Sequence, residues 1–112
     1  MTSERLAPFD VVVVPFPFSD VAGSKRRPAL VISSAAFDSS GHTVLAMITT
    51  SGQHPWPGDC PITDLQAAGL PRPCIARLKL FTLDNRVILR RIGRLAKKDI
   101  SSVKKALDAH LA

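Results

Sequence analysis

The chain has 112 residues, 46% of them hydrophobic and 21% charged, which is the composition of an ordinary globular domain. Its longest apolar runs, residues 11–14 and 29–32, are far shorter than the ~20 residues that cross a bilayer, and the first residues lack the apolar segment of a signal peptide, so we expect a cytoplasmic protein. Fifteen Lys and Arg against nine Asp and Glu give a net charge of +6, which favours a polyanionic partner such as nucleic acid.

The length predicts one domain over residues 1–112, of which residues 1–8 form a polar lead. A chain this short buries roughly 65% of its unfolded surface, so its core is modest. Pairing with a second copy of the chain would therefore add stability.

Runs of β-branched and apolar residues predict strands, because such side chains fit the pleated and half-buried surface of a sheet. The expected strands are residues 11–14, 29–33, 43–50, 74–81 and 87–95. Glycine, proline and polar clusters predict loops or turns at residues 19–27, 39–41, 51–59 and 82–86. Pro28 is expected at the entrance of the second strand, where the absence of an N–H is tolerated.

Two helical segments are expected between and after these strands. Residues 64–69 predict one helical turn that ends at a glycine, and an amphipathic helix begins at Lys97. Its apolar residues recur every three or four positions, at Ile100, Val103, Leu107 and Leu111, while the lysines occupy the other face. Five or six short strands and one terminal helix predict a mainly β fold, a small barrel closed by the helix.

Cysteine and histidine give no sign of a metal site. Cys60 and Cys74 have no zinc-type spacing and are expected to be reduced core thiols, and the histidines, His42, His54 and His110, are scattered. The glycine-rich loops that bind phosphate and the serine nucleophile elbow are absent from the sequence. We therefore expect neither a metal nor a cofactor.

A group of cationic and hydroxyl side chains remains as the candidate site. Lys25, Arg26 and Arg27 stand directly before the second strand, where a guanidinium could grip a phosphate bidentately, although a solvated turn gives the same pattern. Hydroxyl groups that could donate to the same phosphate end the third strand, at Thr49, Thr50 and Ser51. Taken in isolation, a strand end followed by a turn is the simpler explanation of those residues.

Several other side chains have both a structural and an RNA-binding interpretation. Trp56, in the 51–59 loop, could stack on an unpaired base or could pack as a lid on the barrel. Arg77 and Lys79 alternate with Ala76, Leu78 and Leu80, which predicts that the two cations share an outward face and either follow an RNA backbone or are simply solvated. The aromatic residues between the early prolines are interpreted as core or dimer contacts: Phe16 and Phe18.

Five segments in this order resemble the MazF/PemK-like family of toxin–antitoxin ribonucleases. They are residues 10–16 (DVVVVPF), 25–33 (KRRPALVIS), 47–51 (MITTS), 69–83 (GLPRPCIARLKLFTL) and 103–107 (VKKAL), and the resemblance covers roughly residues 9–111. The chain departs from the family pattern in its first loop, residues 20–24 (DVAGS), and at Phe9, where a glycine is usual.

The resemblance implies an SH3-like barrel with a C-terminal helix, a homodimer, and metal-independent cleavage of single-stranded RNA by an mRNA interferase that an acidic antitoxin neutralises. The arginine that directly precedes Pro28, which the family uses in catalysis, corresponds to Arg27. The catalytic threonine or serine of the family corresponds to Thr49. The flanking residues are then expected to bind RNA: Lys25, Arg26, Thr50, Ser51, Trp56, Arg77 and Lys79.

Two other functions compete with the nuclease. One is a non-catalytic toxin of the same general fold, similar to the CcdB type, that inhibits DNA gyrase by protein contact. The other is a relative that binds RNA without cutting it. The presence of both Arg27 and Thr49 favours the nuclease.

Overall fold

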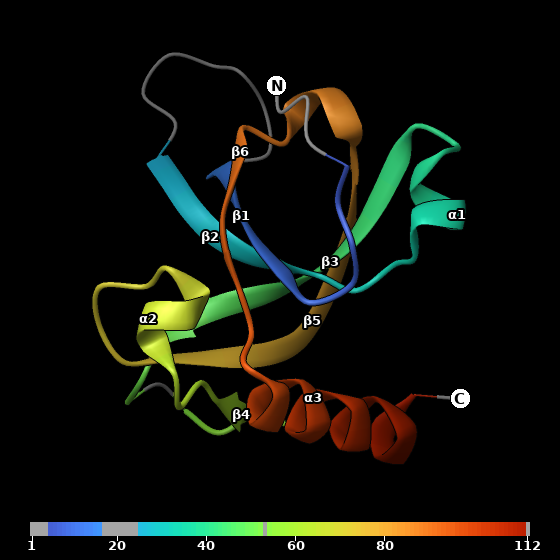
Figure 1. Ribbon diagram of the computed structural model, residues 1–112. Helices are drawn as coiled ribbons and strands as arrows, with labels where there is room; N and C mark the ends of the chain where they lie inside the picture. Colours follow the sequence, from blue (N-terminus) through green and yellow to red (C-terminus); the bar gives the residue numbers. More distant parts are fainter. Residues whose placement is uncertain (1–4, 17–24, 53, 112) are drawn as a thin grey trace.

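The computed structural model describes residues 5–16, 25–52 and 54–111, and Figure 1 shows their arrangement. Six strands dominate the chain: β1 (Asp10–Phe16), β2 (Lys25–Val31), β3 (His42–Thr50), β4 (Cys60–Pro61), β5 (Cys74–Asp84) and β6 (Arg90–Arg94). The helices are α1 (Ala35–Asp38), α2 (Leu65–Ala68), the 3₁₀ turn η1 (Asn85–Val87) and α3 (Lys97–His110). No helix among the described residues is long and apolar enough to cross a membrane.

The strands form one antiparallel sheet in the order β4-β5-β3-β2-β1-β6, which curls into a half-barrel (Figure 1). The predicted mainly β fold with a C-terminal helix is therefore confirmed. The two edge strands do not pair with each other; α2, which lies between β4 and β5 in the sequence, packs against β6 instead.

The contact between α2 and β6 depends on two glycines. A Cβ on Gly93 would lie 2.4 Å from the carbonyl carbon of Ala68, and a Cβ on Gly69 would lie 2.1 Å from the carbonyl oxygen of Ile92. Gly69 is also the left-handed residue that ends α2, with φ 73°, while the Asp64 side chain accepts from Ala67 N at the other end of the helix. The expected helical turn over residues 64–69 is thus confirmed, and it closes the gap between the two edges.

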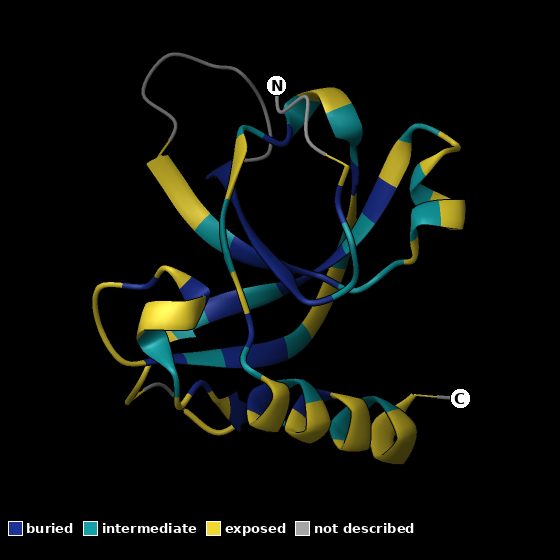
Figure 2. Cartoon of the chain, in the orientation of Figure 1, coloured by how far each residue is buried: buried dark blue, intermediate teal, exposed yellow. Residues whose placement is uncertain are grey.

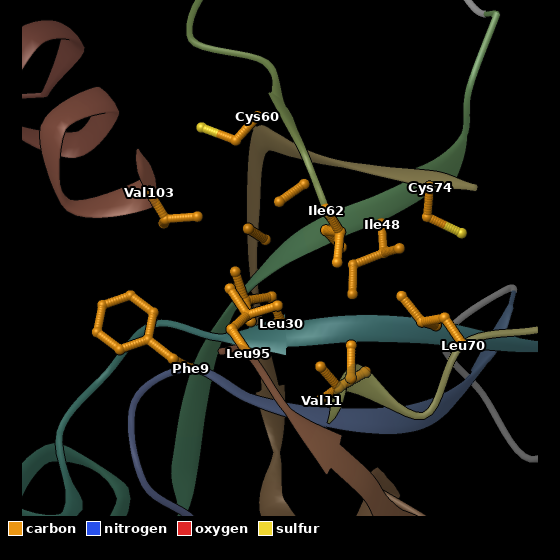
Figure 3. Packing of buried hydrophobic residues seen from close by; sticks show 13 residues of the cluster. Phe9, Val11, Leu30, Ile48, Cys60, Ile62, Leu70, Cys74, Leu95 and Val103 are labelled. Carbon is orange, nitrogen blue, oxygen red and sulfur yellow. The ribbon is translucent and has the colours of Figure 1, made fainter. Parts of the chain in front are cut away.

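Both faces of the central strands are buried, because the sheet curls on itself and receives the helix on one side (Figure 2). The alternation along β1 distributes neighbouring valines between two clusters: Val11 packs with Leu30 and Ile48, and Val12 and Val14 pack with Leu45 and Ile88. Figure 3 shows the first cluster, to which α3 contributes Val103.

Helix α3 confirms the amphipathic pattern. Val103 is buried, Ile100 and Leu107 are partly buried against the first cluster, and the lysines lie on the exposed face. Leu111 departs from the expectation: it follows the helix and is 40% exposed.

The buried carboxylate of Asp99 joins α3 to the segment after β4. It accepts hydrogen bonds from the backbone N–H of Thr63 and of Asp64 and from the Thr63 hydroxyl. Burial raises the pKa of Asp99, but these hydrogen bonds outweigh it and leave the pKa below its ordinary value.

Phe9, which stands where the family pattern has a glycine, adopts a backbone conformation that favours glycine. Phe9 has φ 74°, and it is the non-glycine residue with positive φ among those described. Two strand-like hydrogen bonds hold it there, from Phe9 N to Val31 O and from Leu95 N to Phe9 O, and its ring is buried in the first cluster. Burial of the ring offsets a backbone conformation that costs roughly 1–2 kcal/mol.

The second strand begins earlier than expected. Residues 25–27 belong to β2, so the predicted loop over 19–27 is wrong for its last three residues. The rest of that loop, residues 19–24, and Phe18 lie outside the described residues. Pro28 is therefore inside the strand, opposite Val13, and not at its entrance. It is tolerated because β3 joins β2 only from Ala29 onward, which leaves one side of the strand unpaired at the proline.

The later strands also differ from the sequence-based expectation. Strand β5 continues through the predicted turn at 82–86 as far as Asp84, and the predicted strand over 87–95 is reduced to β6 after the 3₁₀ turn η1. The short α1 and β4 were not expected at all. Each of these four-residue or shorter elements is stabilised by tertiary contacts that local periodicity does not show.

Candidate functional site

The candidate site lies in a fork between β2 and β3. The two strands pair only at Ala29–Met47, Leu30–Ala46 and Val31–Leu45. Beyond that point the early residues of β2 follow β1, while the end of β3 follows β5, and the two arms separate (Figure 1). The split exposes the edges of both strands at the same place.

A pocket of about 510 Å³ fills this fork. Arg26, Arg27 and Pro28 line it from β2, and residues 47–50 line it from β3. Val14 and Phe16 contribute from β1, and Cys74 and Phe81 from β5. The segment after α2 adds the remaining lining residues: Leu70, Pro71 and Arg72. The pocket is thus cationic on one wall, hydroxyl-bearing on the other and apolar beneath.

Arg27 and Thr49 occupy matching positions on the two arms. The β2–β3 register pairs Ala29 with Met47, so one further step of two residues on each strand would set Arg27 opposite Thr49. Side chains two residues apart share a face of the sheet. The guanidinium of Arg27 and the hydroxyl of Thr49 therefore point to the same side of the fork, and the same register brings Arg26 and Thr50 to the other side.

The pocket gathers four of the nine residues expected in the site: Arg26, Arg27, Thr49 and Thr50. Lys25 and Ser51 are exposed and extend the two arms without lining the pocket. Arg72 was missed as a site residue, although it stands in one of the segments that carry the family resemblance. The signal in the sequence was its position between two prolines, which hold an exposed cation in a fixed loop.

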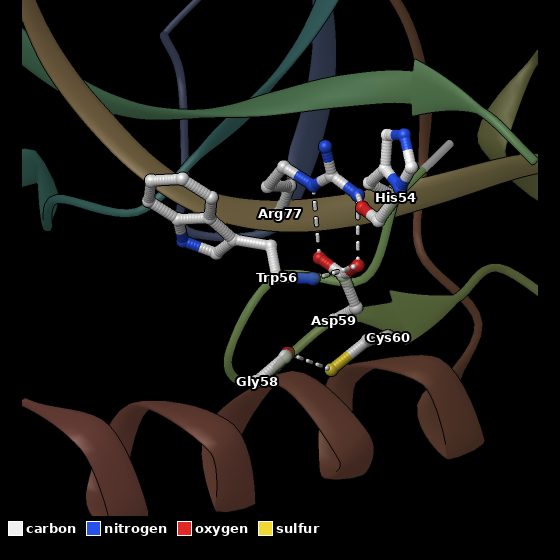
Figure 4. A network of polar contacts seen from close by, with 6 residues as sticks. All are labelled: His54, Trp56, Gly58, Asp59, Cys60 and Arg77. Carbon is white, nitrogen blue, oxygen red and sulfur yellow. Dashed lines mark hydrogen bonds and ion pairs between the residues drawn. The ribbon is translucent and has the colours of Figure 1, made fainter.

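The expectation that Arg77 points outward beside Lys79 is wrong. Arg77 is 9% exposed and forms a two-point ion pair with Asp59, with Nε 3.0 Å from Oδ1 and Nη2 2.9 Å from Oδ2 (Figure 4). Its Nη2 also donates to the carbonyl oxygen of His54. These hydrogen bonds from Arg77 hold the pKa of Asp59 below its ordinary value and raise the pKa of Arg77.

The cause of this error is the 54–59 loop, which covers Arg77 through the Asp59 carboxylate and the His54 carbonyl. Strand β5 also departs from regular pairing. The β3–β5 register shifts between Ala46 and Met47, so that Arg77 opposes Met47 while Leu80 opposes Ala46. The two residues in between are extra on β5, as in a β-bulge. Lys79 is exposed as expected, but Leu80, expected to point inward, is 39% exposed.

Trp56 does not line the pocket. It is 40% exposed, and Lys79 Nζ lies 4.5 Å from the centroid of its ring. Its backbone N–H donates to Asp59 Oδ2, and Asp59 N donates back to its carbonyl, so the tryptophan and the ion pair belong to one closed loop.

Both cysteines are free and buried, which confirms the expected core thiols. Burial raises the pKa of each thiol, so both are protonated at neutral pH. The Sγ of Cys74 donates to the Arg72 carbonyl at the edge of the pocket. Within the described residues, no group of three or more His, Cys, Asp or Glu side chains is placed to hold a metal ion.

Residues 7–111 of the sequence match the family described as PemK-like, MazF-like toxin of type II toxin–antitoxin system. No curated protein sequence matches the chain.

Solved structures share the fold at low sequence identity. An endoribonuclease from a mycobacterial species, in complex with its cognate antitoxin, superposes with a TM-score of 0.72 at 15% identity, covering 95% of this chain and 94% of that one. The Mycobacterium tuberculosis toxin MazF-mt6 gives 0.70 at 19% identity, with 89% and 93% covered. A MazE–MazF structure from Deinococcus radiodurans gives 0.71 at 21% identity, with 96% and 97% covered.

Proposed function

The chain belongs to the PemK-like, MazF-like toxins of type II toxin–antitoxin systems, and from this premise we propose that it is a metal-independent endoribonuclease whose reaction takes place in the fork between β2 and β3. The substrate is single-stranded RNA. The observation that carries the proposal is the matching placement of Arg27 and Thr49 on the two arms, on one face and in one pocket.

RNA supplies its own nucleophile, so the protein needs only to orient a phosphodiester and to stabilise charge. The 2′-oxygen attacks the adjacent phosphorus and loses its proton, the P–O5′ bond breaks, and the leaving oxygen gains a proton. The products are a 2′,3′-cyclic phosphate and a 5′-hydroxyl. A pocket that holds cationic and hydroxyl donors around the phosphorus favours the charged intermediate over the ground state.

In this mechanism Arg27 donates to the non-bridging oxygens of the phosphate, where negative charge increases. A guanidinium is a poor proton acceptor, so the contribution of Arg27 is mainly electrostatic. Thr49 donates a hydrogen bond to the same phosphate from the other arm. Arg26 and Thr50 line the pocket on its second side and hold the adjacent backbone, and Lys25 and Ser51 extend the positive and hydroxyl-bearing arms outward.

The second expected partner is an acidic antitoxin, and the protein itself is proposed to act as a homodimer. Two of the structures that share the fold contain an antitoxin, the mycobacterial endoribonuclease complex and the MazE–MazF structure. A disordered acidic segment suits this chain because its net charge is +6 and the fork is cationic on one wall. Such a segment would occupy the positions of the RNA phosphates.

The direct test is incubation of the purified protein with mixed single-stranded RNA in EDTA, followed by sequencing of the new 5′ ends and analysis of their chemistry. We expect cleavage that persists in EDTA and leaves 5′-hydroxyl and cyclic phosphate ends. Binding of RNA without cleavage would support the inactive relative instead. Neither binding nor cleavage, together with inhibition of DNA gyrase, would support the gyrase-directed toxin.

A further inference from the structure

The loop that carries Trp56 lies on the same face of the sheet as the candidate catalytic pair. Arg77 opposes Met47 in the β3–β5 register, so its side chain points to the face that carries Met47 and Thr49. The 54–59 loop covers Arg77 through His54 and Asp59. Strand β5 is the neighbour of β3, about 5 Å away. A single strand of RNA that leaves the fork across β3 therefore reaches this loop next.

Hydrogen bonds from Arg77 and within the loop itself fix the conformation of the 54–59 loop. Arg77 contributes three hydrogen bonds, two to the Asp59 carboxylate and one to the His54 carbonyl (Figure 4). Asp59 in turn accepts from the Trp56 backbone N–H, and the Asp59 N–H donates to the Trp56 carbonyl. An aromatic side chain on a loop with this support loses little additional freedom when a ligand binds.

The Trp56 side chain nevertheless remains exposed to solvent over part of its surface. Trp56 is 40% exposed, and Lys79 lies against its ring at 4.5 Å. Trp56 is the largest apolar side chain of this small protein, but neither core cluster includes it. An exposed aromatic surface beside a cation matches a nucleotide, which has a flat apolar base and an anionic phosphate.

We propose that Trp56 and Lys79 form a second nucleotide-binding subsite, in which Trp56 stacks on an unpaired base next to the bound phosphodiester and Lys79 contacts the phosphate of that nucleotide. Arg77 and Asp59 act as positioning residues for this subsite and do not touch the RNA. The proposal rests on the proposed ribonuclease function, because it assigns the subsite to the same RNA strand. Stacking does not depend on one particular base, so the subsite adds affinity more than sequence preference.

The composition of the chain supplies a direct probe. Trp56 is the single tryptophan and the sequence contains no tyrosine, so the intrinsic emission excited at long wavelength reports this side chain alone. The ligand is a short 2′-O-methyl oligonucleotide of randomised sequence, which lacks the nucleophile and is not cleaved. We expect saturable quenching of Trp56 emission by this oligonucleotide. An abasic oligonucleotide with the same backbone should bind through its phosphates and quench little.

The matched variants are measured by the anisotropy of a labelled oligonucleotide. Trp56→Leu is expected to weaken binding by about 10- to 100-fold, and Trp56→Phe should recover part of the loss because it restores an aromatic face. Phe37→Leu is the control, since Phe37 is a comparably exposed aromatic residue, 45% exposed, on α1 and outside the fork. It should leave binding unchanged.

The outcomes separate this inference from the function on which it rests. Cleavage of RNA together with tight oligonucleotide binding, unchanged Trp56 emission and an unaffected Trp56→Leu variant would overturn the subsite and leave the nuclease standing. Quenching by an acidic peptide but not by the oligonucleotide would overturn it in favour of a protein-docking surface. Absence of both RNA binding and cleavage would overturn the two proposals together.

Discussion

The guanidinium of Arg27 lies over the ring of Phe16, 5.9 Å from its centroid. The β1–β2 register pairs Val14 with Arg27, so Phe16, two residues further along β1, shares the face of Arg27 and lies diagonal to it. Phe16 is 42% exposed and lines the pocket, so the expected core position is wrong, while the alternative, a dimer contact, stays a prediction. The contact restricts the orientations of Arg27 at the mouth of the fork.

Removal of either member of the proposed catalytic pair should slow cleavage with little effect on folding. For Arg27→Ala and Thr49→Ala we expect a reduction in kcat of ~10²–10³, the usual cost of losing a donor to transition-state charge. Neither residue belongs to the core clusters, so the melting temperatures should stay close to that of the wild type. Arg86→Ala is the matched control, because Arg86 is exposed and pairs with Asp84 outside the pocket. Near-normal cleavage by either variant at equal folded concentration would contradict the assignment.

Phe16 should affect the reaction through Arg27. Phe16→Leu keeps an apolar side chain but removes the π face, and an exposed cation–π contact stabilises by about 0.5–1 kcal/mol. We expect a two- to fivefold fall in kcat, with Phe16→Tyr close to the wild type. If Phe16→Leu slows the Arg27→Ala variant by the same factor, Phe16 does not act through Arg27.

The ion pair between Arg77 and Asp59 gives the stability of the protein an acid-dependent component. Because the hydrogen bonds from Arg77 lower the pKa of Asp59 in the folded state, this stabilisation is complete above the ordinary carboxyl pKa of 3.8 and is lost as the pH falls below it. Asp84, whose pKa its neighbour Arg86 lowers to about 2, loses its contribution in the same range. Urea unfolding between pH 7 and pH 2 should show the decline. Asp59→Asn should be less stable than the wild type at pH 7 but should lose less on acidification; equal slopes for the two proteins would contradict the linkage.

Closure of the half-barrel should be sensitive to one added methyl group. In Gly93→Ala the new Cβ would meet the Ala68 carbonyl carbon at 2.4 Å and the Ala67 carbonyl oxygen at 2.6 Å, so α2 must move away from β6. We expect a loss of about 3 kcal/mol in the free energy of unfolding. Gly41→Ala, where a Cβ would meet nothing within 4 Å but φ is +100°, should cost only about 1 kcal/mol from backbone strain. Similar melting temperatures for the two variants would show that the α2–β6 contact is not required.

RNA and an acidic antitoxin segment should compete for the fork. Of the cations expected to bind RNA, Arg77 is taken up by its ion pair with Asp59, and Arg72 joins the pocket as a further cation. Arg27→Ala should weaken both ligands, and association should slow steeply with added salt. Lys104→Ala with Lys105→Ala, on the exposed face of α3, should affect neither. Simultaneous binding without mutual loss of affinity would contradict a shared site.

A second copy of the chain is expected in solution, because the core is modest and the family resemblance implies a pair. Light scattering at micromolar concentration should give a mass of about twice 12.1 kDa. A mass of 12.1 kDa at that concentration and above would refute the dimer.

The local chemistry of the sequence was sufficient for the identity of most elements. The valine run, the period of α3 and the Asp64–Gly69 turn each act over a few residues, and each forms where the pattern placed it. The segments that resemble the family also indicated Arg27 and Thr49 as the candidate pair. What they could not indicate is the fork itself, since it arises where β2 and β3 stop pairing with each other.

Tertiary structure decided the features in which two distant segments meet. Arg77 is buried because Asp59 and the His54 carbonyl bond to it, and no alternation within β5 could reveal a contact that another segment makes. Pro28 lies within a strand because β3 is absent from that side. Phe9 keeps a left-handed backbone because segments distant in the sequence supply its two hydrogen-bond partners and the core around its ring. The sequence determined which side chains could carry out phosphate chemistry, whereas the pairing of strands determined which of them face the same pocket.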